Sequence, residues 1–292
     1  MKFDKNTLGR VLIIAGSDSS GGAGIQADIK TCAAFGVYST TAITAITAQN
    51  TLGVQRVEAL KPSLVADQMR SVFSDIGADV IKIGMLANRD IIEAVAEVLE
   101  NDCADISVVL DPVLVSTSGD NLLEDKALCV LKERLIPLAD VITPNSVEAG
   151  ILTGMNVDDT DGLIKAGEAL LGMGAYNSLM KGGHIKGKSI IDILVTPEGN
   201  QIMSAPRIHS RHTHGTGCTL ASALAALLAK GAPIETAVQE AREFIYEAIK
   251  TAPQLGQGNG PLNHGLDMGG NMGKTLQKNP NENNPFAALK DL

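Results

Sequence analysis

The stretch Val11-Leu-Ile-Ile-Ala-Gly-Ser-Asp-Ser-Ser-Gly-Gly-Ala-Gly-Ile-Gln-Ala-Asp28 joins a short apolar run to a loop with four glycines and then to a helical pattern. Such a unit often holds a phosphate, because the N–H groups of the loop and of the helix start point toward an anion. Gly16 and Gly21 have P-loop spacing, but Gly22 stands where that loop needs its lysine. Residues 22–27 fit the dinucleotide-binding fingerprint, yet no acidic residue ends the next strand. A plain turn that needs positive φ angles is the third interpretation.

The rest of the chain alternates short apolar runs with amphipathic helical patterns. This alternation predicts an α/β fold, with a mostly parallel central sheet and helices on both faces. We expect strands at 11–15, 40–47, 80–83, 106–110, 141–143, 178–181, 190–195 and 201–204, and helices at 24–35, 63–76, 91–99, 122–135, 147–152, 163–173, 219–229 and 234–252. No linker divides the chain, so residues 1–264 are expected to form a single domain. Residues 265–292 are rich in Gly, Asn, Lys and Pro and are expected to form a mobile tail.

The composition excludes several classes of partner. Of the 292 residues, 45% are hydrophobic and 20% charged, which is ordinary for a soluble globular protein. The net charge of −9, with no basic cluster, argues against nucleic acid or an anionic membrane as the main partner. The apolar segments are too short or too interrupted for a secretory signal or a membrane-spanning helix. Four cysteines without CxxC spacing predict reduced thiols in a cytoplasmic protein.

A second glycine-rich loop, His212-Thr-His-Gly-Thr-Gly-Cys-Thr219, leads directly into a strong helical pattern. The N–H groups of Gly215, Thr216 and Gly217 are expected to point off the helix N-terminus and form an anion site. Cys218 would then lie in the first turn, where thiol pKa values fall. The alternative is a glycine-rich cap with a buried structural cysteine. A metal site built from the histidines of this segment and Cys218 matches no common zinc spacing.

Charged residues follow three of the predicted strands. Asp111 comes after the strand at 106–110, Glu148 lies just beyond the strand at 141–143, and Lys181 ends the strand at 178–181. In an open α/β sheet, the carboxyl ends of the strands are where ligands bind. Carboxylates there can hold Mg²⁺, and a lysine can reach a phosphate. Each acid alone is explained better as a helix cap or a first-turn charge, but together these parts are those that phosphoryl transfer needs.

The ordered set of motifs resembles one family. These motifs are residues 15–31, Thr47-Ala-Gln-Asn50, Lys82-Ile-Gly-Met85, Asp111-Pro-Val113, Thr143-Pro-Asn145 with Glu148, Lys181-Gly-Gly-His184 and His214-Gly-Thr-Gly-Cys-Thr219. Together they resemble the hydroxymethylpyrimidine/phosphomethylpyrimidine kinases of thiamine biosynthesis, which belong to the ribokinase-like superfamily. The resemblance runs from about residue 11 to residue 264. It implies a ribokinase-like three-layer sandwich and ATP-dependent phosphorylation of the hydroxymethylpyrimidine and then of its monophosphate, with Mg²⁺.

The resemblance also implies roles for particular residues. Gln49 would hydrogen-bond the aminopyrimidine, since its carboxamide offers a donor and an acceptor. Asp28, Gly16 and Met85 would line the same substrate site. The ATP phosphates would lie at Gly215, Thr216 and Gly217, Lys181 would support the transferred group, and Asp111 and Glu148 would lie near Mg²⁺.

Cys218 stands where most ribokinase-like enzymes have an aspartate base, so it would face the substrate hydroxyl, either accepting its proton or only positioning it. Residues 114–118 depart from the family in lacking a lysine that many relatives carry there.

Three other functions compete with this interpretation. A pyridoxal or pyridoxine kinase of the same superfamily would use a ring of similar size that also bears a hydroxymethyl group. A nicotinamide-dependent oxidoreductase would explain residues 22–24 but would leave Lys181 and the second glycine-rich loop unused. A sensor of phosphate or of a thiamine precursor would need no transfer machinery. A homodimer is compatible with the family and with the low aromatic content of 3%.

Overall fold

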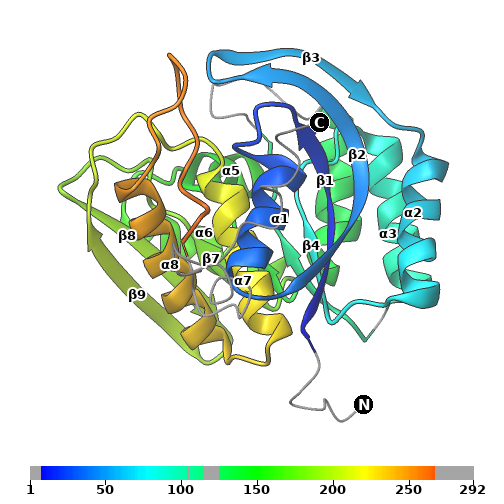
Figure 1. The fold of residues 1–292 in the computed structure, drawn as a ribbon. Helices are drawn as coiled ribbons and strands as arrows, with labels where there is room; N and C mark the ends of the chain where they lie inside the picture. The colour runs from blue at the N-terminus through cyan, green and yellow to red at the C-terminus, as the bar shows by residue number, and fades with distance from the viewer. Residues whose placement is uncertain (1–7, 104, 115–124, 267–292) are drawn as a thin grey trace, which may run out of the picture.

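The computed structural model describes residues 8–103, 105–114 and 125–266, and within them nine strands form one sheet (Figure 1). The strands are β1 (Arg10–Asp18), β2 (Tyr38–Asn50), β3 (Gly53–Ala59), β4 (Val80–Ile83), β5 (Ser107–Leu110), β6 (Val141–Ile142), β7 (Asn177–Met180), β8 (Ser189–Thr196) and β9 (Gly199–Pro206). Their order is β3-β2-β1-β4-β5-β6-β7-β8-β9. Neighbours from β2 to β7 pair in parallel, whereas β3, β8 and β9 join in antiparallel fashion. The predicted mostly parallel sheet is confirmed.

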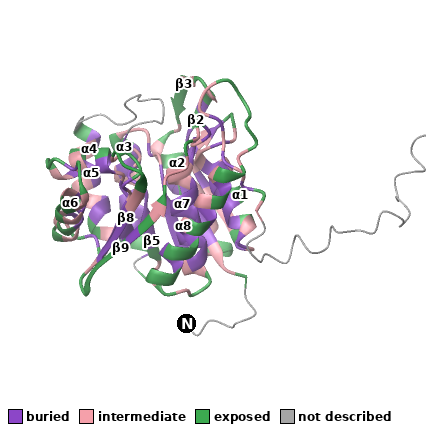
Figure 2. Ribbon diagram, turned by 90° about the vertical axis from the view of Figure 1, so that its left-hand side faces the viewer, coloured by how far each residue is buried: buried purple, intermediate pink, exposed green. Residues whose placement is uncertain are grey.

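Helices cover both faces of this sheet. They are α1 (Gly24–Ala34), α2 (Pro62–Asp75), α3 (Arg89–Asp102), α4 (Asp125–Val130), α5 (Ser146–Thr153), α6 (Thr160–Gly172), α7 (Thr216–Ala229) and α8 (Ile234–Lys250). Apolar residues of α1, α7 and α8 pack on one face, and those of α2 to α6 pack on the other. Figure 2 shows the buried residues concentrated in the sheet and in the helix surfaces that face it.

Strand β1 shows why the sequence forms this sandwich. Val11, Ile13 and Ala15 face the layer of α1, α7 and α8, while Leu12 and Ile14 face the opposite layer. Because successive side chains of a strand point to opposite faces, a strand covered on both sides must be apolar at every position. The run at 11–15 meets this requirement, and all five of its side chains are at most 1% exposed.

The predicted elements differ from the structure in two places. Strand β3 was not predicted, because it is an antiparallel edge strand whose side chains are mostly exposed and include Arg56 and Glu58. The helix expected at 122–135 is described only from Asp125; α4 ends at Val130, and a π-helical turn follows at Leu131–Leu135. The segment 115–124 and the predicted tail beyond residue 266 lie outside the described residues.

Two further observations bear on the expected class of protein. All four cysteines are free thiols, and only Cys129 among them is exposed. Among the described residues, no helix combines the length and the apolar character needed to cross a membrane.

The topology brings the candidate residues to one edge of the sheet. In parallel strands the carboxyl ends lie together, and here β1 ends at Asp18, β4 is followed by Met85, β5 by Asp111 and β7 by Lys181. The N-terminus of α7 faces the same edge: a Cβ at Gly217 would lie 3.2 Å from Nζ of Lys181. Residues far apart in the sequence therefore meet at one site, as the rule for open α/β sheets predicts.

Candidate active site

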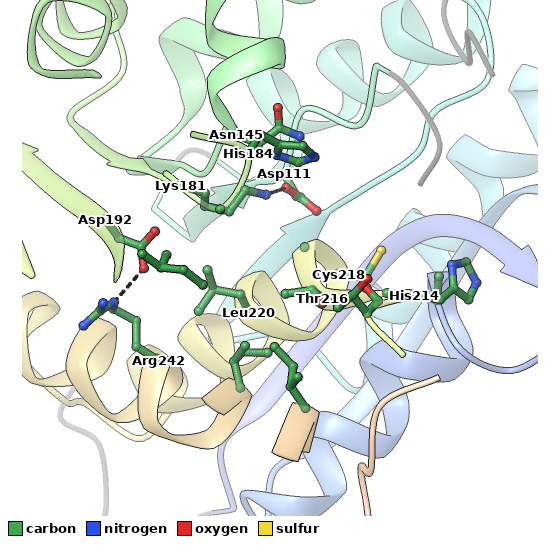
Figure 3. A pocket seen from close by; sticks show the side chains of 18 of the residues that line it. Asp111, Asn145, Lys181, His184, Asp192, His214, Thr216, Cys218, Leu220 and Arg242 are labelled. Carbon is green, nitrogen blue, oxygen red and sulfur yellow. Dashed lines mark hydrogen bonds and ion pairs between the residues drawn. The ribbon is translucent and has the colours of Figure 1, made fainter. Parts of the chain in front are cut away.

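A cavity of about 1400 Å³ opens at this edge and is lined by nearly all of the predicted site residues (Figure 3). Gly16, Gln49 and Met85 line it together with Asp111, Glu148, Lys181 and residues 215–218. From there the cavity extends toward β8, β9 and α8, where Met203, Leu220 and Ile249 supply apolar surface. It is large enough for two ligands of moderate size lying end to end.

The carboxylate of Asp18 fixes the conformation of the opening glycine-rich loop through hydrogen bonds to its main chain. The carboxylate accepts hydrogen bonds from the N–H groups of Ser20 and Ala23, each at 2.8 Å, and from Nε2 of His214 at 2.8 Å. Burial acts to raise the pKa of Asp18, but the hydrogen bonds from His214, Ser20 and Ala23 outweigh it and lower this pKa. The first loop is thus joined to the second through one buried carboxylate.

Two glycines allow the loops to approach this closely. Gly24 has a φ of 56°, and a Cβ there would lie 2.3 Å from the carbonyl oxygen of Gly16. Gly215 has a φ of 81°, and a Cβ there would lie 1.8 Å from the carbonyl oxygen of Gly22. Both positions need the left-handed conformation and the missing side chain of glycine. The interpretation of the first loop as a turn with positive φ is therefore correct, and the loop also lines the cavity.

The start of α7 carries the predicted anion site, with one change. The N–H group of Thr216 already donates to the carbonyl oxygen of Thr213, at 3.3 Å. Within the described part of the chain, the N–H groups of Gly215, Gly217 and Cys218 have no hydrogen-bond acceptor. The main-chain donors at this helix terminus are therefore Gly215, Gly217 and Cys218, rather than the predicted set that included Thr216. They lie where the helix dipole favours negative charge.

Lys181 places its ammonium group beside these donors. Nζ lies 2.9 Å from Oδ1 of Asp111, which also accepts a hydrogen bond from Oγ1 of Thr143 at 3.1 Å. Burial acts to lower the pKa of Lys181, but the carboxylates of Asp111 and Glu148 outweigh it, so this pKa lies above its usual value. Lys181 is therefore positively charged at neutral pH and is available to a phosphate.

Glu148 has the helix-capping role that the sequence left open, and its side chain also faces the cavity. It forms a capping box with Asn145 at the start of α5, accepting the N–H of Asn145 at 2.8 Å, and it also lines the cavity. Burial, together with the negative charge of Asp111, raises the pKa of Glu148 to about 7, although Lys181 opposes the shift. A carboxyl group in this state changes its charge near neutral pH.

This raised pKa predicts how stability depends on pH. The protonated form of Glu148 is favoured in the folded state, so its contribution to stability is complete below pH 4.5 and is lost as the pH rises through about 7. A Glu148→Gln variant keeps the capping acceptor and does not titrate. We expect it to gain stability relative to the parent between pH 5 and 8, by on the order of 2 kcal/mol. Thermal unfolding across this range measures the difference.

The matched control is Glu168→Gln, because Glu168 is exposed on α6. Its stability relative to the parent should not change with pH. A pH-independent difference between Glu148→Gln and the parent would show that the carboxyl group of Glu148 titrates at its usual pH.

The donor set fits Mg²⁺ only as a partial site. Oδ2 of Asp111 makes no hydrogen bond among the described residues. The carboxylate of Glu148 accepts the N–H groups of Asn145 and Leu114, and its oxygens keep further lone pairs for a ligand. In the same part of the chain, no group of three or more His, Cys, Asp or Glu residues is arranged to hold a metal. Mg²⁺ commonly binds through one or two carboxylates, water and substrate phosphates, and the two acids suit that mode.

At the opposite end of the cavity, Gln49, Gly16 and Met85 lie together as predicted. A Cβ at Gly16 would lie 3.3 Å from Sδ of Met85, so a side chain larger than glycine at position 16 would press on Met85. Nε2 of Gln49 lies 3.3 Å from Nε2 of His214. Because that His214 nitrogen donates to Asp18, it cannot also accept a proton from Gln49. The amide of Gln49 is therefore free to donate to a ligand.

Asp28 does not fit its predicted contact with the substrate. Its side chain is 0% exposed and accepts hydrogen bonds from Nζ of Lys82 at 2.8 Å and from Oγ of Ser222 at 2.7 Å. These partners enclose the carboxylate beneath the cavity, and Asp28 does not line the cavity itself. The prediction placed Asp28 near the substrate site correctly, but the Asp28 side chain is buried beneath the cavity and does not reach a ligand there.

Cys218 also differs from its expected state. It lies in the first turn of α7 and lines the cavity, as predicted. Burial, together with the negative charges of Asp28 and Asp111, raises the pKa of its thiol to about 11, although Lys82 and the N–H of Gly24 act in the opposite direction. The expected fall in pKa at a helix N-terminus is therefore outweighed, and Cys218 is a neutral thiol at pH 7.

Three functional residues were missed at the sequence level. His214 and Asp18 join the two glycine-rich loops, and His184 lies beside the cavity near Lys181 and Asn145 (Figure 3). The sequence does contain a signal for each, since His214 and His184 stand within the quoted motifs and Asp18 within the opening loop. Their partners could not be identified because Asp18 and His214 are separated by 196 positions.

Comparisons with known proteins identify the family of this chain. A family model described as phosphomethylpyrimidine kinase matches residues 18–263. This chain belongs to the phosphomethylpyrimidine kinase family. The hydroxymethylpyrimidine/phosphomethylpyrimidine kinase of Streptomyces coelicolor is 47% identical over 259 residues, which cover 89% of this chain and 95% of that protein. A thiamine biosynthesis bifunctional protein of Geobacter sulfurreducens is 48% identical over 256 residues, or 88% of this chain, and the chain spans only 52% of its length.

Solved structures of family members and related kinases have the same fold. The phosphomethylpyrimidine kinase from Clostridium difficile gives a TM-score of 0.74 at 43% identity, covering 82% of this chain and 99% of that one. Bacillus subtilis pyridoxal kinase, in an ADP complex, gives a TM-score of 0.82 at 37% identity, covering 89% and 98% of the two chains. The predicted ribokinase-like fold and kinase class are confirmed, and the oxidoreductase and sensor interpretations are set aside.

Proposed function

We propose that this phosphomethylpyrimidine kinase family member transfers the γ-phosphoryl group of ATP to the hydroxymethyl group of 4-amino-5-hydroxymethyl-2-methylpyrimidine. A second transfer to the phosphate of the product then gives the diphosphate, for thiamine biosynthesis. The observation that carries the proposal is the arrangement within one cavity: Lys181 and the free N–H groups of α7 lie at its centre, and Gln49 lies at one end.

The phosphates of ATP are assigned to the start of α7. The N–H groups of Gly215, Gly217 and Cys218 and the ammonium of Lys181 converge there, so negative charge that develops during transfer meets fixed donors. Asp111 and Glu148 would hold Mg²⁺ through their carboxylate oxygens and water, and the ion would supply charge neutralisation for the phosphates. Phosphoryl transfer depends mainly on such positioning and charge stabilisation.

The adenine of ATP is assigned to the part of the cavity between β9 and α8. Its apolar surface from Met203, Ile245 and Ile249 suits a planar base. The ion pair between Arg242 and Asp192, with 2.8 Å between Nε and Oδ2, joins α8 to β8 in this region (Figure 3). Asp192 also accepts the N–H of Gly182 at 2.9 Å, which connects this region to the loop that follows Lys181.

The pyrimidine is assigned to the end formed by Gly16, Gln49 and Met85, with its hydroxymethyl group toward Cys218. The thiol is neutral at pH 7, so it meets the substrate as a hydrogen-bonding group and not as a resident thiolate. In the first transfer the acceptor is an alcohol that must lose its proton. Cys218 can receive that proton only as the thiolate, after its own proton has passed to water. In the second transfer the acceptor is a phosphate that is already anionic.

A product assay tests the proposal. Purified protein is incubated with Mg-ATP and, in separate reactions, with the hydroxymethylpyrimidine, its monophosphate or pyridoxal, and the products are identified by mass. We expect mono- and diphosphorylated pyrimidine and little pyridoxal phosphate. Pyridoxal phosphate as the dominant product would overturn the substrate assignment and support the second candidate, pyridoxal kinase, which the likeness to the Bacillus subtilis pyridoxal kinase structure favours.

Gln49 is predicted to contribute to pyrimidine binding. A Gln49→Ala variant removes a free amide that faces the ring, and one such hydrogen bond is worth about 1 kcal/mol. We expect the KM for the pyrimidine to rise about fivefold, since 1.4 kcal/mol corresponds to a factor of ten, while the KM for ATP stays unchanged. Steady-state kinetics with each substrate varied in turn measures both constants.

The control for this change is Gln55→Ala, because Gln55 is exposed on β3 and does not line the cavity. It should leave both KM values at the parent level. An unaltered KM for the pyrimidine in Gln49→Ala would remove Gln49 from the binding site.

The setting of the enzyme is also proposed. We assign residues 1–264 to a single kinase domain that works in the cytoplasm, where free thiols stay reduced.

We propose a homodimer, supported by apolar side chains on β2 and β3 that are exposed in the single chain, such as Ile46 at 45% and Val57 at 40%. Light scattering of the purified protein decides the oligomeric state, and a monomer at micromolar concentration would exclude the dimer.

A further inference from the structure

An ion pair lies buried beneath the active-site cavity. Nζ of Lys82, at the cavity end of β4, is 2.8 Å from Oδ2 of Asp28 on α1, and both side chains are 0% exposed. Removing two charges from water is costly, and apolar residues in place of such a pair are often equally or more stable. A fully buried pair next to a reaction site therefore calls for an explanation other than stability.

The pair is connected to Cys218 through α7. Oγ of Ser222 donates to Oδ1 of Asp28 at 2.7 Å. Ser222 follows Cys218 by four positions on α7, and residues with this spacing lie on the same face of a helix. The face of α7 that carries the Cys218 side chain toward the cavity therefore meets the carboxylate of Asp28 one turn further along.

Gly84, which has no side chain, leaves space for the ammonium of Lys82. A Cβ at Gly84 would lie 2.9 Å from Nζ of Lys82, so a larger residue at Gly84 would displace the ammonium. Asp28 occupies one of the three donor positions of the ammonium. Lys82 does not line the cavity, so it acts on the reaction only through its neighbours.

Four charged groups surround the thiol of Cys218. Lys82 from β4 and Lys181 after β7 favour the thiolate, whereas Asp28 from α1 and Asp111 after β5 oppose it. Lys181 is turned toward Asp111 at 2.9 Å and toward the phosphate site. Lys82 is thus the cation that is held by Asp28 and does not line the cavity.

We propose that Lys82 is a positioning residue for the first phosphorylation. Its ammonium, held by Asp28, which Ser222 in turn fixes, is the buried positive charge that makes the thiolate form of Cys218 accessible when the substrate hydroxyl reacts. This inference rests on the role given to Cys218 in the proposed function. It gives the lysine of the Lys82-Ile-Gly-Met85 motif on β4 a role in setting the charge of Cys218 on α7.

The test uses two variants in a Cys129→Ser background, which removes the exposed thiol. Lys82→Met keeps the length of the side chain and loses the charge. Lys82→Met/Asp28→Asn removes both charges and keeps an acceptor for Ser222. Alkylation of Cys218 by iodoacetamide at pH 8.5 is followed by peptide mass, because the thiolate is the species that reacts. We expect alkylation of Cys218 to slow about tenfold in Lys82→Met, equivalent to one unit of pKa. It should slow less in the double variant, because the loss of Asp28 removes a charge that opposes the thiolate.

Activity and stability separate this role from a merely structural one. The double variant is expected to melt near the parent temperature, because no unpaired charge remains buried. Its kcat for the first phosphorylation should fall by the same factor as its alkylation rate, and its KM values should stay unchanged. A double variant with the parent alkylation rate and kcat would overturn the proposal. So would one that is unfolded at the assay temperature, because the pair would then be required for the fold. Alkylation needs no substrate, so a chain that phosphorylated only pyridoxal would overturn the proposed function and leave this result intact.

Discussion

A Lys181→Met variant is expected to lose about 10²- to 10³-fold in kcat for both phosphorylations. The ammonium lies beside the N–H donors at the start of α7, with a Cβ at Gly217 only 3.2 Å from Nζ, so it is placed to meet charge on the transferred group. Removing one preorganised donor of this kind from an active site costs about that factor. Both steps should suffer equally, because the transferred group is the same whichever acceptor receives it.

The loss in Lys181→Met should appear in kcat and not in the KM for the pyrimidine, because the proposed ring site at Gln49 and Met85 does not include Lys181. The matched control is Lys188→Met, since Lys188 is exposed in the loop that follows β7. Thermal unfolding of both variants is needed, because Lys181→Met leaves the buried carboxylate of Asp111 without its cation. A folded Lys181→Met variant with more than a tenth of the parent kcat would exclude Lys181 from transition-state stabilisation.

The strands that were predicted most accurately are the central ones, which are covered by helices on both faces of the sheet. The strand at 80–83 was placed correctly because three of its four residues, Val80, Ile81 and Ile83, are apolar, and all four positions are buried as in a central parallel strand. Strand β3 was missed because it lies at an edge and carries exposed polar residues, which resemble a loop in sequence. Periodicity therefore detects the elements that build the core, and edge strands escape it.

The site was predicted by position more accurately than by chemistry. Asp111 and Lys181 were placed together because both follow parallel strands, and the sheet brings such positions to one edge. The state of Asp28 and Cys218 could not be predicted, because it depends on partners that only the fold supplies. Asp28 is separated from Lys82 by 54 positions and from Ser222 by 194. Burial beside these charges determines which carboxylate meets the ligand and which thiol keeps its proton.

A Cys218→Ala variant is expected to slow the first phosphorylation much more than the second, whereas Lys181→Met should slow both equally. The first acceptor is an alcohol, and a positioned proton acceptor contributes about 10²- to 10⁴-fold to reactions of this kind. The second acceptor is a phosphate monoester that is already ionised near neutral pH, since the second pKa of such a phosphate is about 6. We therefore expect kcat for the first phosphorylation to fall at least ~10²-fold, and that for the second to change far less. Separate assays with the hydroxymethylpyrimidine and with its monophosphate measure the two effects.

The raised pKa of Cys218 makes this separation informative. A thiol with a pKa of about 11 is a poor resident base but a strong acceptor once ionised, so it matters only where a proton must leave. Cys103→Ala is the matched control, because Cys103 is buried in the opposite helical layer and should affect stability without favouring either step. Equal losses in both phosphorylations would mean that Cys218 only shapes the cavity, and the charge that Lys82 places beneath it would then have no catalytic consequence.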